Sequence, residues 1–201
     1  MTMNGEGTGR RGPYAKSAER RRTIVEAAHA VFAAQGYRGG SLQDVADLVG
    51  MSQTSLLHYF PSKRDLLIAV LNLRDSITGD GSASPVDEDF VDSVERQARY
   101  NESHHGVVEL YTVLCAESLT DEHPGREFFV QRFANLRASY TDEFTSLAQS
   151  GRLRDGVDPA QAAASLVALW DGIQTQWLLD HDSVDVPRSL RAFFDLVLIQ
   201  E

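Results

Sequence analysis

The sequence of 201 residues contains one cysteine, Cys115, and no long hydrophobic run. A single cysteine excludes a disulfide within the chain and argues against a zinc site built from thiolates. A membrane span needs roughly 18 apolar residues without charge, and no stretch approaches this length. No leader of charged and then apolar residues is present either. These absences predict a cytoplasmic protein with no membrane segment, in which Cys115 packs in the core.

The sequence also lacks the patterns of strands and of common enzymes. No stretch alternates apolar and polar residues with a period of two for long enough to predict a strand. There is no nucleophile elbow, phosphate-binding loop or dinucleotide-binding glycine pattern. We therefore expect an all-α protein that is not an enzyme and needs no cofactor.

His104, His105 and Glu109 leave one alternative open, a metal-dependent helical protein. His105 and Glu109 are four residues apart, and this spacing can place two metal ligands on one face of a helix. No third ligand is recognisable, and the sequence "SHHG" is typical of a helix break. We expect no metal site.

Basic residues are scarce overall, since 19 Lys or Arg stand against 29 Asp or Glu and the net charge is -10. The deficit is confined to one part of the chain. Residues 1–64 carry nine basic and five acidic residues, a balance of +4, whereas residues 65–201 carry ten and 24, a balance of -14. Because charges act over a Debye length of roughly 8 Å, a basic head on an acidic body can still bind nucleic acid. An uneven scatter of surface charge is the alternative.

The first 16 residues are rich in glycine and almost free of apolar side chains, which predicts a disordered basic arm over residues 1–16. Arg10, Arg11 and Lys16 could follow DNA phosphates or enter a minor groove, or they could remain in solvent. Helical periodicity begins after this arm, at Ser17.

Apolar residues at helical spacing predict about nine helices in the remainder of the chain. On the first helix, a single apolar stripe is formed by Ile24, Ala27, Ala28, Val31 and Phe32. The expected helices cover residues 17–35, 42–49, 53–60, 63–77, 86–102, 106–119, 124–149, 158–180 and 186–200. A Gly/Ser-rich break at 79–89 separates a small head from a larger body.

Two short helices joined by a tight turn follow the first helix, and together they predict a helix-turn-helix domain over residues 17–62. Gly50 in that turn permits a positive φ, and Ser41 and Ser52 can cap the two short helices. The apolar positions that hold such a unit together are Val45, Ala46, Met51 and Leu56. The remainder of the chain, residues 63–201, forms the helical body.

Burial of Leu56 and Phe60 turns the other face of the second short helix outward. Its side chains suit base edges in a major groove, where Gln can pair with adenine and Thr can contact a thymine methyl group. The predicted base-reading residues are Gln53, Thr54, Ser55 and His58. The predicted phosphate contacts are the helix starts at Ser41 and Ser52 and the flanking side chains of Tyr59 and Lys63.

Residues 17–71 resemble the DNA-binding region of the TetR family of transcriptional regulators. The resemblance is carried by "TIVEAAHAVFAAQGYRGGSLQDVADLVGMSQTSLLHYFPSKRDLL". It implies that Tyr59 and Lys63 contact the DNA backbone, and that the helix from Lys63 connects the head to a ligand-binding body. Gly40 is a departure, because the family commonly has a small or polar residue there.

The segment "SLVALWDGIQTQWLLDHD" (165–182) resembles the penultimate helix of many family members. The last two helices are strongly apolar, and the resemblance implies that they pair with a second copy in a four-helix homodimer interface. Their apolar residues are Leu166, Leu169, Trp170, Ile173, Trp177, Leu190, Phe193, Phe194, Val197 and Leu198. The alternative is that these residues only close the core of the monomer.

The resemblance also implies an effector site inside the body, between the middle helices and the penultimate one. Candidate contacts, each of which can instead be ordinary core, are Tyr111, Leu114, Phe129, Phe133, Trp170, Gln174 and Trp177. Gln174 lies between two tryptophans on one face, where a polar group could orient a ligand in an apolar cavity.

These features predict a homodimeric repressor that binds a palindromic operator in double-stranded DNA and is released by a small-molecule effector. Release requires that the effector bind two states of the protein with different affinity. The alternative is a regulator of the same fold that activates transcription or responds to a partner protein.

Overall fold

The computed structural model describes residues 13–78, 89–120 and 122–199, and the regular structure in these ranges is helical. An isolated bridge pairs Leu153 with Leu198 and joins the loop after the seventh helix to the end of the last one. The all-α class predicted from the sequence is confirmed.

The number and order of the helices agree with the prediction, and their ends differ by a few residues. Within the described ranges, the helices are α1 (Pro13–Gly39), α2 (Leu42–Val49), α3 (Gln53–Leu57), α4 (Lys63–Thr78), α5 (Phe90–Ser103), α6 (His105–Glu117), α7 (Arg126–Gln149), α8 (Pro159–Leu179) and α9 (Val186–Val197).

The largest difference is at α1. This helix already includes residues 13–16, so Lys16 is not part of a disordered arm and that part of the prediction is wrong. The rest of the expected arm, with Arg10 and Arg11, lies outside the described residues. α1 also continues past its predicted end, but Gly36 interrupts it with a φ of 69° and a ψ of 172°.

Three other helix ends have local explanations. The Asp89 side chain accepts a hydrogen bond from the Val91 N–H and caps α5, whereas the predicted residues 86–88 lie outside the described ranges. α3 ends at Leu57 and is followed by a turn, so its predicted extension to residue 60 is wrong. α9 ends at Val197 because Leu198 has extended backbone angles, φ -101° and ψ 153°.

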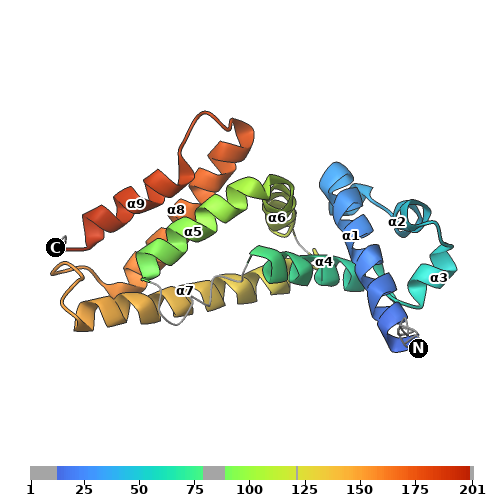
Figure 1. Ribbon diagram of the computed structural model, residues 1–201, viewed down its shortest axis with the longest axis horizontal. Coiled ribbons are helices and arrows are strands. Elements are labelled where there is room, and N and C mark those ends of the chain that lie inside the picture. The colour runs from blue at the N-terminus through green and yellow to red at the C-terminus, as the bar shows by residue number, and fades with distance from the viewer. Residues whose placement is uncertain (1–12, 79–88, 121, 200–201) are drawn as a thin grey trace, which may run out of the picture.

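The molecule is elongated, with the head at one end and the body at the other (Figure 1). α1, α2 and α3 form the head, and α4 runs from the head into the body. In the body, α7 packs along α8, while α9 packs against both α5 and α8. α6 lies beside α1, so α4 and α6 are the elements that connect the two parts.

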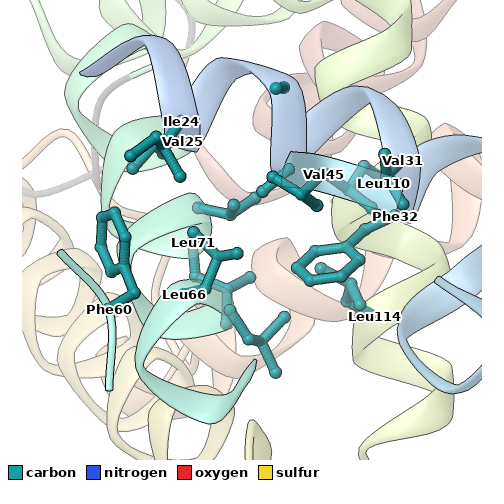
Figure 2. Close-up of a cluster of buried hydrophobic side chains, with 14 of the residues drawn as sticks. Ile24, Val25, Val31, Phe32, Val45, Phe60, Leu66, Leu71, Leu110 and Leu114 are labelled. Carbon is teal, nitrogen blue, oxygen red and sulfur yellow. The ribbon is translucent and has the colours of Figure 1, made fainter. Parts of the chain in front are cut away.

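The head is held together by one hydrophobic cluster. Phe32 of α1, Val45 of α2 and Leu66 of α4 are fully buried in it. Figure 2 shows these side chains together with Leu110 and Leu114 of α6. The hydrophobic core therefore crosses the domain boundary expected at residue 62.

A second cluster fills the body. The ring of Phe90 in α5 lies edge-on to the rings of Phe144 and Phe194, with 5.5 Å between centroids in each pair. Most of the apolar residues expected at a dimer interface are buried in this cluster, namely Leu166, Ile173, Trp177, Leu190, Phe194 and Leu198. The rest of that set, Leu169, Trp170, Phe193 and Val197, packs against it. These buried side chains close the core of the monomer, which is the alternative given above, and the pairing of α8 and α9 with a second copy stays a prediction.

Candidate nucleic-acid interface and effector site

A capping box starts the helix-turn-helix at α2. The Ser41 Oγ accepts a hydrogen bond from the Asp44 N–H at 3.1 Å, and the Asp44 carboxylate accepts one from the Ser41 N–H at 2.9 Å. The Ser41 hydroxyl also donates to that carboxylate at 2.6 Å, and these bonds lower the pKa of Asp44. The Ser41 hydroxyl is thus engaged in the cap, and its contact with phosphate stays a prediction.

The turn after α2 has the predicted glycine geometry. Gly50 is left-handed, with φ 70° and ψ 43°, and its N–H donates to the Asp47 carbonyl at 3.1 Å. The Met51 N–H donates to the Ala46 carbonyl at 2.9 Å, which completes the reversal. Ala46 is fully buried, and Met51 packs against the head cluster. Local hydrogen bonds and core packing together set the angle at which α3 leaves the turn.

α3 presents the predicted polar face to solvent. The Ser52 Oγ caps the helix by accepting a hydrogen bond from the Ser55 N–H at 3.1 Å. Leu56 and Phe60 are fully buried and anchor the segment in the head. The outward residues are Gln53, Thr54 and His58, which are exposed, and Ser55, which is half-buried. The side chains chosen as base readers therefore lie together on an accessible surface.

Tyr59 lies at the base of this surface and is tied to α1. Arg21 donates a hydrogen bond from Nη1 to the Tyr59 carbonyl at 2.6 Å, and its guanidinium lies 4.0 Å from the centroid of the Phe60 ring. Cation–π contact and hydrogen bond together fix the end of the recognition segment. The Tyr59 side chain itself is half-buried.

Lys63 is half-buried and already contacts other residues of the head. Its Nζ lies 4.5 Å from the centroid of the Tyr37 ring and donates to the Arg38 carbonyl at 3.4 Å. Burial lowers the pKa of Lys63, while the charges of Glu117 and Asp44 act to raise it. A contact between Lys63 and phosphate stays a prediction.

The seven expected effector residues lie where the two hydrophobic clusters meet. Those in the head cluster are Tyr111, Leu114 and Phe129. Trp177 lies in the body cluster and Trp170 packs against it, while Gln174 is buried and hydrogen-bonded to Trp170. Phe133 packs against both clusters. The seven residues belong to α6, α7 and α8.

Gln174 is the centre of a buried hydrogen-bond network across α5 and α8. Its Oε1 accepts hydrogen bonds from Trp170 Nε1 at 3.1 Å and from Asn101 Nδ2 at 3.3 Å. Gln97 Nε2 in turn donates to Asn101 Oδ1 at 3.0 Å. Gln174 is only 3% exposed, so these bonds offset the desolvation of its amide. A polar ligand here would have to replace them.

A buried arginine lies on the other side of the same region. Arg132 of α7 donates a hydrogen bond from Nε to the Tyr111 hydroxyl at 3.2 Å. Burial chiefly, and then the charge of Asp171, raises the pKa of Cys115 to about 11 against the opposing effect of Arg132. Cys115 is therefore a thiol at neutral pH and not a reactive thiolate.

Two family models match this chain. Residues 24–70 match the model described as bacterial regulatory proteins, tetR family, and residues 88–198 match the model described as BetI-type transcriptional repressor, C-terminal. The second match alone covers more than half of the 201 residues. The chain belongs to the tetR family of bacterial regulatory proteins.

Relatives of this tetR-family chain are also named as regulators. HTH-type transcriptional regulator RutR of Escherichia coli is 47% identical over 52 residues, which are 26% of this chain and only 24% of RutR. HTH-type transcriptional regulator TtgR of Pseudomonas putida is 24% identical over 200 residues, covering 88% of this chain and 89% of TtgR.

Solved structures show the same fold. SmeT, the repressor of the Stenotrophomonas maltophilia multidrug efflux pump SmeDEF, matches in its complex with triclosan with a TM-score of 0.77 at 17% identity. The match covers 90% of this chain and 93% of SmeT. Within the described ranges of this tetR-family chain, no helix combines the length and hydropathy needed to span a bilayer.

Leu57 is a residue of the outward face that the sequence analysis missed. It is 37% exposed and lies one helical turn from Thr54 and beside His58. An apolar residue in this tetR-family motif suggested core. The available signal was its position directly after Leu56, because adjacent residues of a helix do not face the same side.

Asn101 and Arg132 were missed in the body. Asn101 follows Val94 and Ala98 at helical spacing, so it occupies a position of the buried face of α5. This spacing could have identified it. Arg132 has no comparable signal, because a basic residue in a long helix is normally solvated.

Other polar groupings of the body do not include the predicted effector residues. A groove of about 550 Å³ lies between the start of α5 and α9, and its polar groups pair with one another. In it Arg152 contacts Asp89 at 2.8 Å, and Arg191 contacts Asp92 at 3.6 Å. In the part of the chain that the structure describes, no three His, Cys, Asp or Glu side chains group in a way that could hold a metal ion.

Proposed function

We propose that this tetR-family regulator is a homodimeric repressor that binds a palindromic operator and is released by a small molecule bound in its body. The observation that carries the proposal is the outward face of α3, where Thr54, Leu57 and His58 are exposed on a helix anchored by buried Leu56. A short helix held in this way can enter a major groove with its side chains toward base edges.

The residue types on this face suit direct readout. Gln53 can pair with adenine, and the methyl groups of Thr54 and Leu57 can contact the methyl group of thymine. The basic balance of the head, +4 over residues 1–64, favours the approach of phosphates.

A different face of α8 and α9 supports the homodimer. The exposed side of α8 carries small or short polar residues at helical spacing, namely Ser165, Ala168, Gly172 and Thr175. Leu179 at its end is 85% exposed, Leu196 of α9 is 75% exposed and Ile199 is 52% exposed. Small residues allow close helix contact, and large exposed apolar residues are typical of an interface. The proposed interface is therefore this outer face of α8 and α9.

The effector is proposed to bind where α6, α7 and α8 meet. Aromatic side chains line this region, and the polar groups of Gln174 and Arg132 converge on it. A ligand that replaced the Asn101–Gln174 hydrogen bond, which joins α5 to α8, would shift α8 relative to α5 and thereby favour a second state of the body. SmeT, with its triclosan complex, is an example of the same fold with a small molecule bound.

Selection of DNA from a random pool by the full chain, followed by binding titrations, tests this function. Thr54→Ala and His58→Ala should change the preferred bases, with about 1–3 kcal/mol lost at each position read. Tyr59→Phe and Lys63→Ala should weaken binding to all sequences alike. The control is Gln131→Ala, an exposed position of α7 in the body. The proposal is wrong if the chain selects no sequence, or if all four head variants bind like the control.

A further inference from the structure

The turn between α1 and α2 is tied to the end of α6. Gly36 interrupts α1, and the N–H of the next residue, Tyr37, donates to Glu117 Oε2 at 3.0 Å. The carboxylate is so close that a Cβ on residue 36 would lie 2.7 Å from Glu117 Oε1. Glycine at this position therefore supplies both the positive φ and the space that the carboxylate occupies.

Glu117 is partly buried beside a buried histidine. Its side chain is 25% exposed, and His123, which is 2% exposed, places Nε2 at 3.9 Å from Glu117 Oε2. The Gly125 N–H donates to His123 Nδ1 at 3.2 Å, so the neutral ring carries its proton on Nε2, on the side of Glu117. The edge of the same ring contacts Tyr37, with 5.1 Å between centroids.

A second link runs parallel to the first. Arg38 donates from Nη2 to Thr120 Oγ1 at 3.0 Å, and that hydroxyl donates to the Glu117 carbonyl at 2.7 Å. Lys63 covers the Tyr37 ring from the start of α4. Both hydrogen-bonded links therefore join the turn before α2 to the last residue of α6.

The position of Glu117 connects the two proposed sites. Tyr111, a proposed effector contact, lies six residues earlier on α6, or about 9 Å along a helix. On the other side, Tyr37 comes four residues before the Ser41 cap of α2. A displacement of α6 would therefore move the segment that precedes α2, at the start of the helix-turn-helix (Figure 1).

We infer that Glu117 is a positioning residue, which sets the orientation of α2 and α3 relative to the body through the Tyr37 N–H. The effect of this orientation on DNA binding rests on the proposed function, since the orientation matters only when two heads must match two half-sites. Its structural part, the coupling of α6 to the head, can be tested without DNA or effector.

Hydrogen exchange of single amides in the full chain provides that test, because local opening is reported residue by residue. In Glu117→Ala, the amide of Tyr37 and those of α2 and α3 should exchange about tenfold faster, as expected for loss of a partly buried hydrogen bond. Amides of α7 and α8 should be unchanged. Glu117→Gln keeps an acceptor oxygen and should restore most of the protection. Glu109→Ala, an exposed carboxylate of the same helix, is the matched control.

Three results of the exchange experiment would overturn the inference. These are faster exchange at Tyr37 alone, an equal increase in α7 and α8, and a Glu117→Gln variant that behaves like Glu117→Ala. On DNA selected by the unmodified chain, Glu117→Ala should bind about fivefold or more weakly, with Glu117→Gln near the unmodified chain. Unchanged affinity of Glu117→Ala would also overturn it. If the unmodified chain selects no DNA, the proposed function fails while the exchange result still decides the coupling.

Discussion

Two glycines of the head are required for different physical reasons. Gly50 is left-handed, but a Cβ there would meet nothing within 4 Å. Gly40 is buried, and a Cβ on it would lie 2.8 Å from Val31 Cγ1 and 3.1 Å from Phe32 Cδ1. Gly50 is required for its left-handed backbone conformation, whereas Gly40 is required because there is no space for a side chain. The close packing of Val31 and Phe32 of α1 against the turn thus explains why this chain has glycine at position 40.

Substitutions separate these two requirements. Gly50→Ala should lower the free energy of unfolding by about 1 kcal/mol through the left-handed backbone, and Gly50→Asn should recover much of it, because Asn tolerates that region. Gly40→Ala should lower it by about 1–3 kcal/mol through overpacking, and Gly40→Asn should be worse. Urea denaturation of the four variants measures this. Equal losses for Gly40→Ala and Gly40→Asn, or no benefit of Asn over Ala at Gly50, would contradict the assignment.

At the scale of helices, local signals predicted the head well. Ser41 and Ser52 cap helices, and Gly50 allows the turn between them, through contacts with residues close in sequence. The positions of α2 and α3 can therefore be predicted from the local sequence. The outward face of α3 follows in the same way once Leu56 is buried. Leu57 is the exception, because its apolar side chain favours the core while its position directly after buried Leu56 turns it outward.

The body was less predictable because its contacts are tertiary. The sequence of α8 is apolar on most sides, so periodicity alone could not decide which side faces the core. Packing against α7 and α9 buries Leu166 and Ile173 and leaves Ala168 and Thr175 outside. The fold class and helix order were predictable, whereas the dimer face and the partners of Gln174 were not.

The exposed face of α8 and α9 leads to a prediction about association. Leu179→Glu and Leu196→Glu should each weaken self-association by about tenfold or more, because a charge would be buried in the interface. Leu119→Glu is the control, since Leu119 is 75% exposed like Leu196 but follows α6. Sedimentation velocity over a concentration series measures the effect. A monomeric unmodified chain, or equal association of all three variants, would contradict a dimer through this face.

For the whole molecule, two buried histidines predict that stability depends on pH. Burial lowers the pKa of His29 and of His123 from the ordinary value of 6.5, with Glu117 opposing and Arg38 adding to the effect at His123. The Nε2 atoms of both rings are buried and have no hydrogen-bond partner in the described part of the chain. Folding therefore favours the neutral form of both side chains.

The sign of the effect follows from proton binding. Between the lowered pKa values and 6.5, the unfolded chain binds more protons than the folded one, so the free energy of unfolding rises with pH. It should be highest above about pH 7 and fall as the pH is lowered through about 6.5, levelling below the folded pKa values. Burial chiefly, and also Asp185, raises the pKa of Glu102 above its ordinary value of 4.5. Near that value, Glu102 therefore makes the free energy of unfolding fall as the pH rises, opposite to the histidines. The effect of the histidines on the free energy of unfolding should therefore be measured above about pH 5.5.

Urea denaturation between about pH 7.5 and pH 5.5 should show this loss in the unmodified chain. His29→Gln and His123→Gln should each remove part of it, and the double variant should be nearly independent of pH in this range. His58→Gln is the control, because His58 is exposed on α3. An unmodified chain with constant stability over this range, or a double variant that keeps the full slope, would show that these rings are not the groups that folding holds neutral.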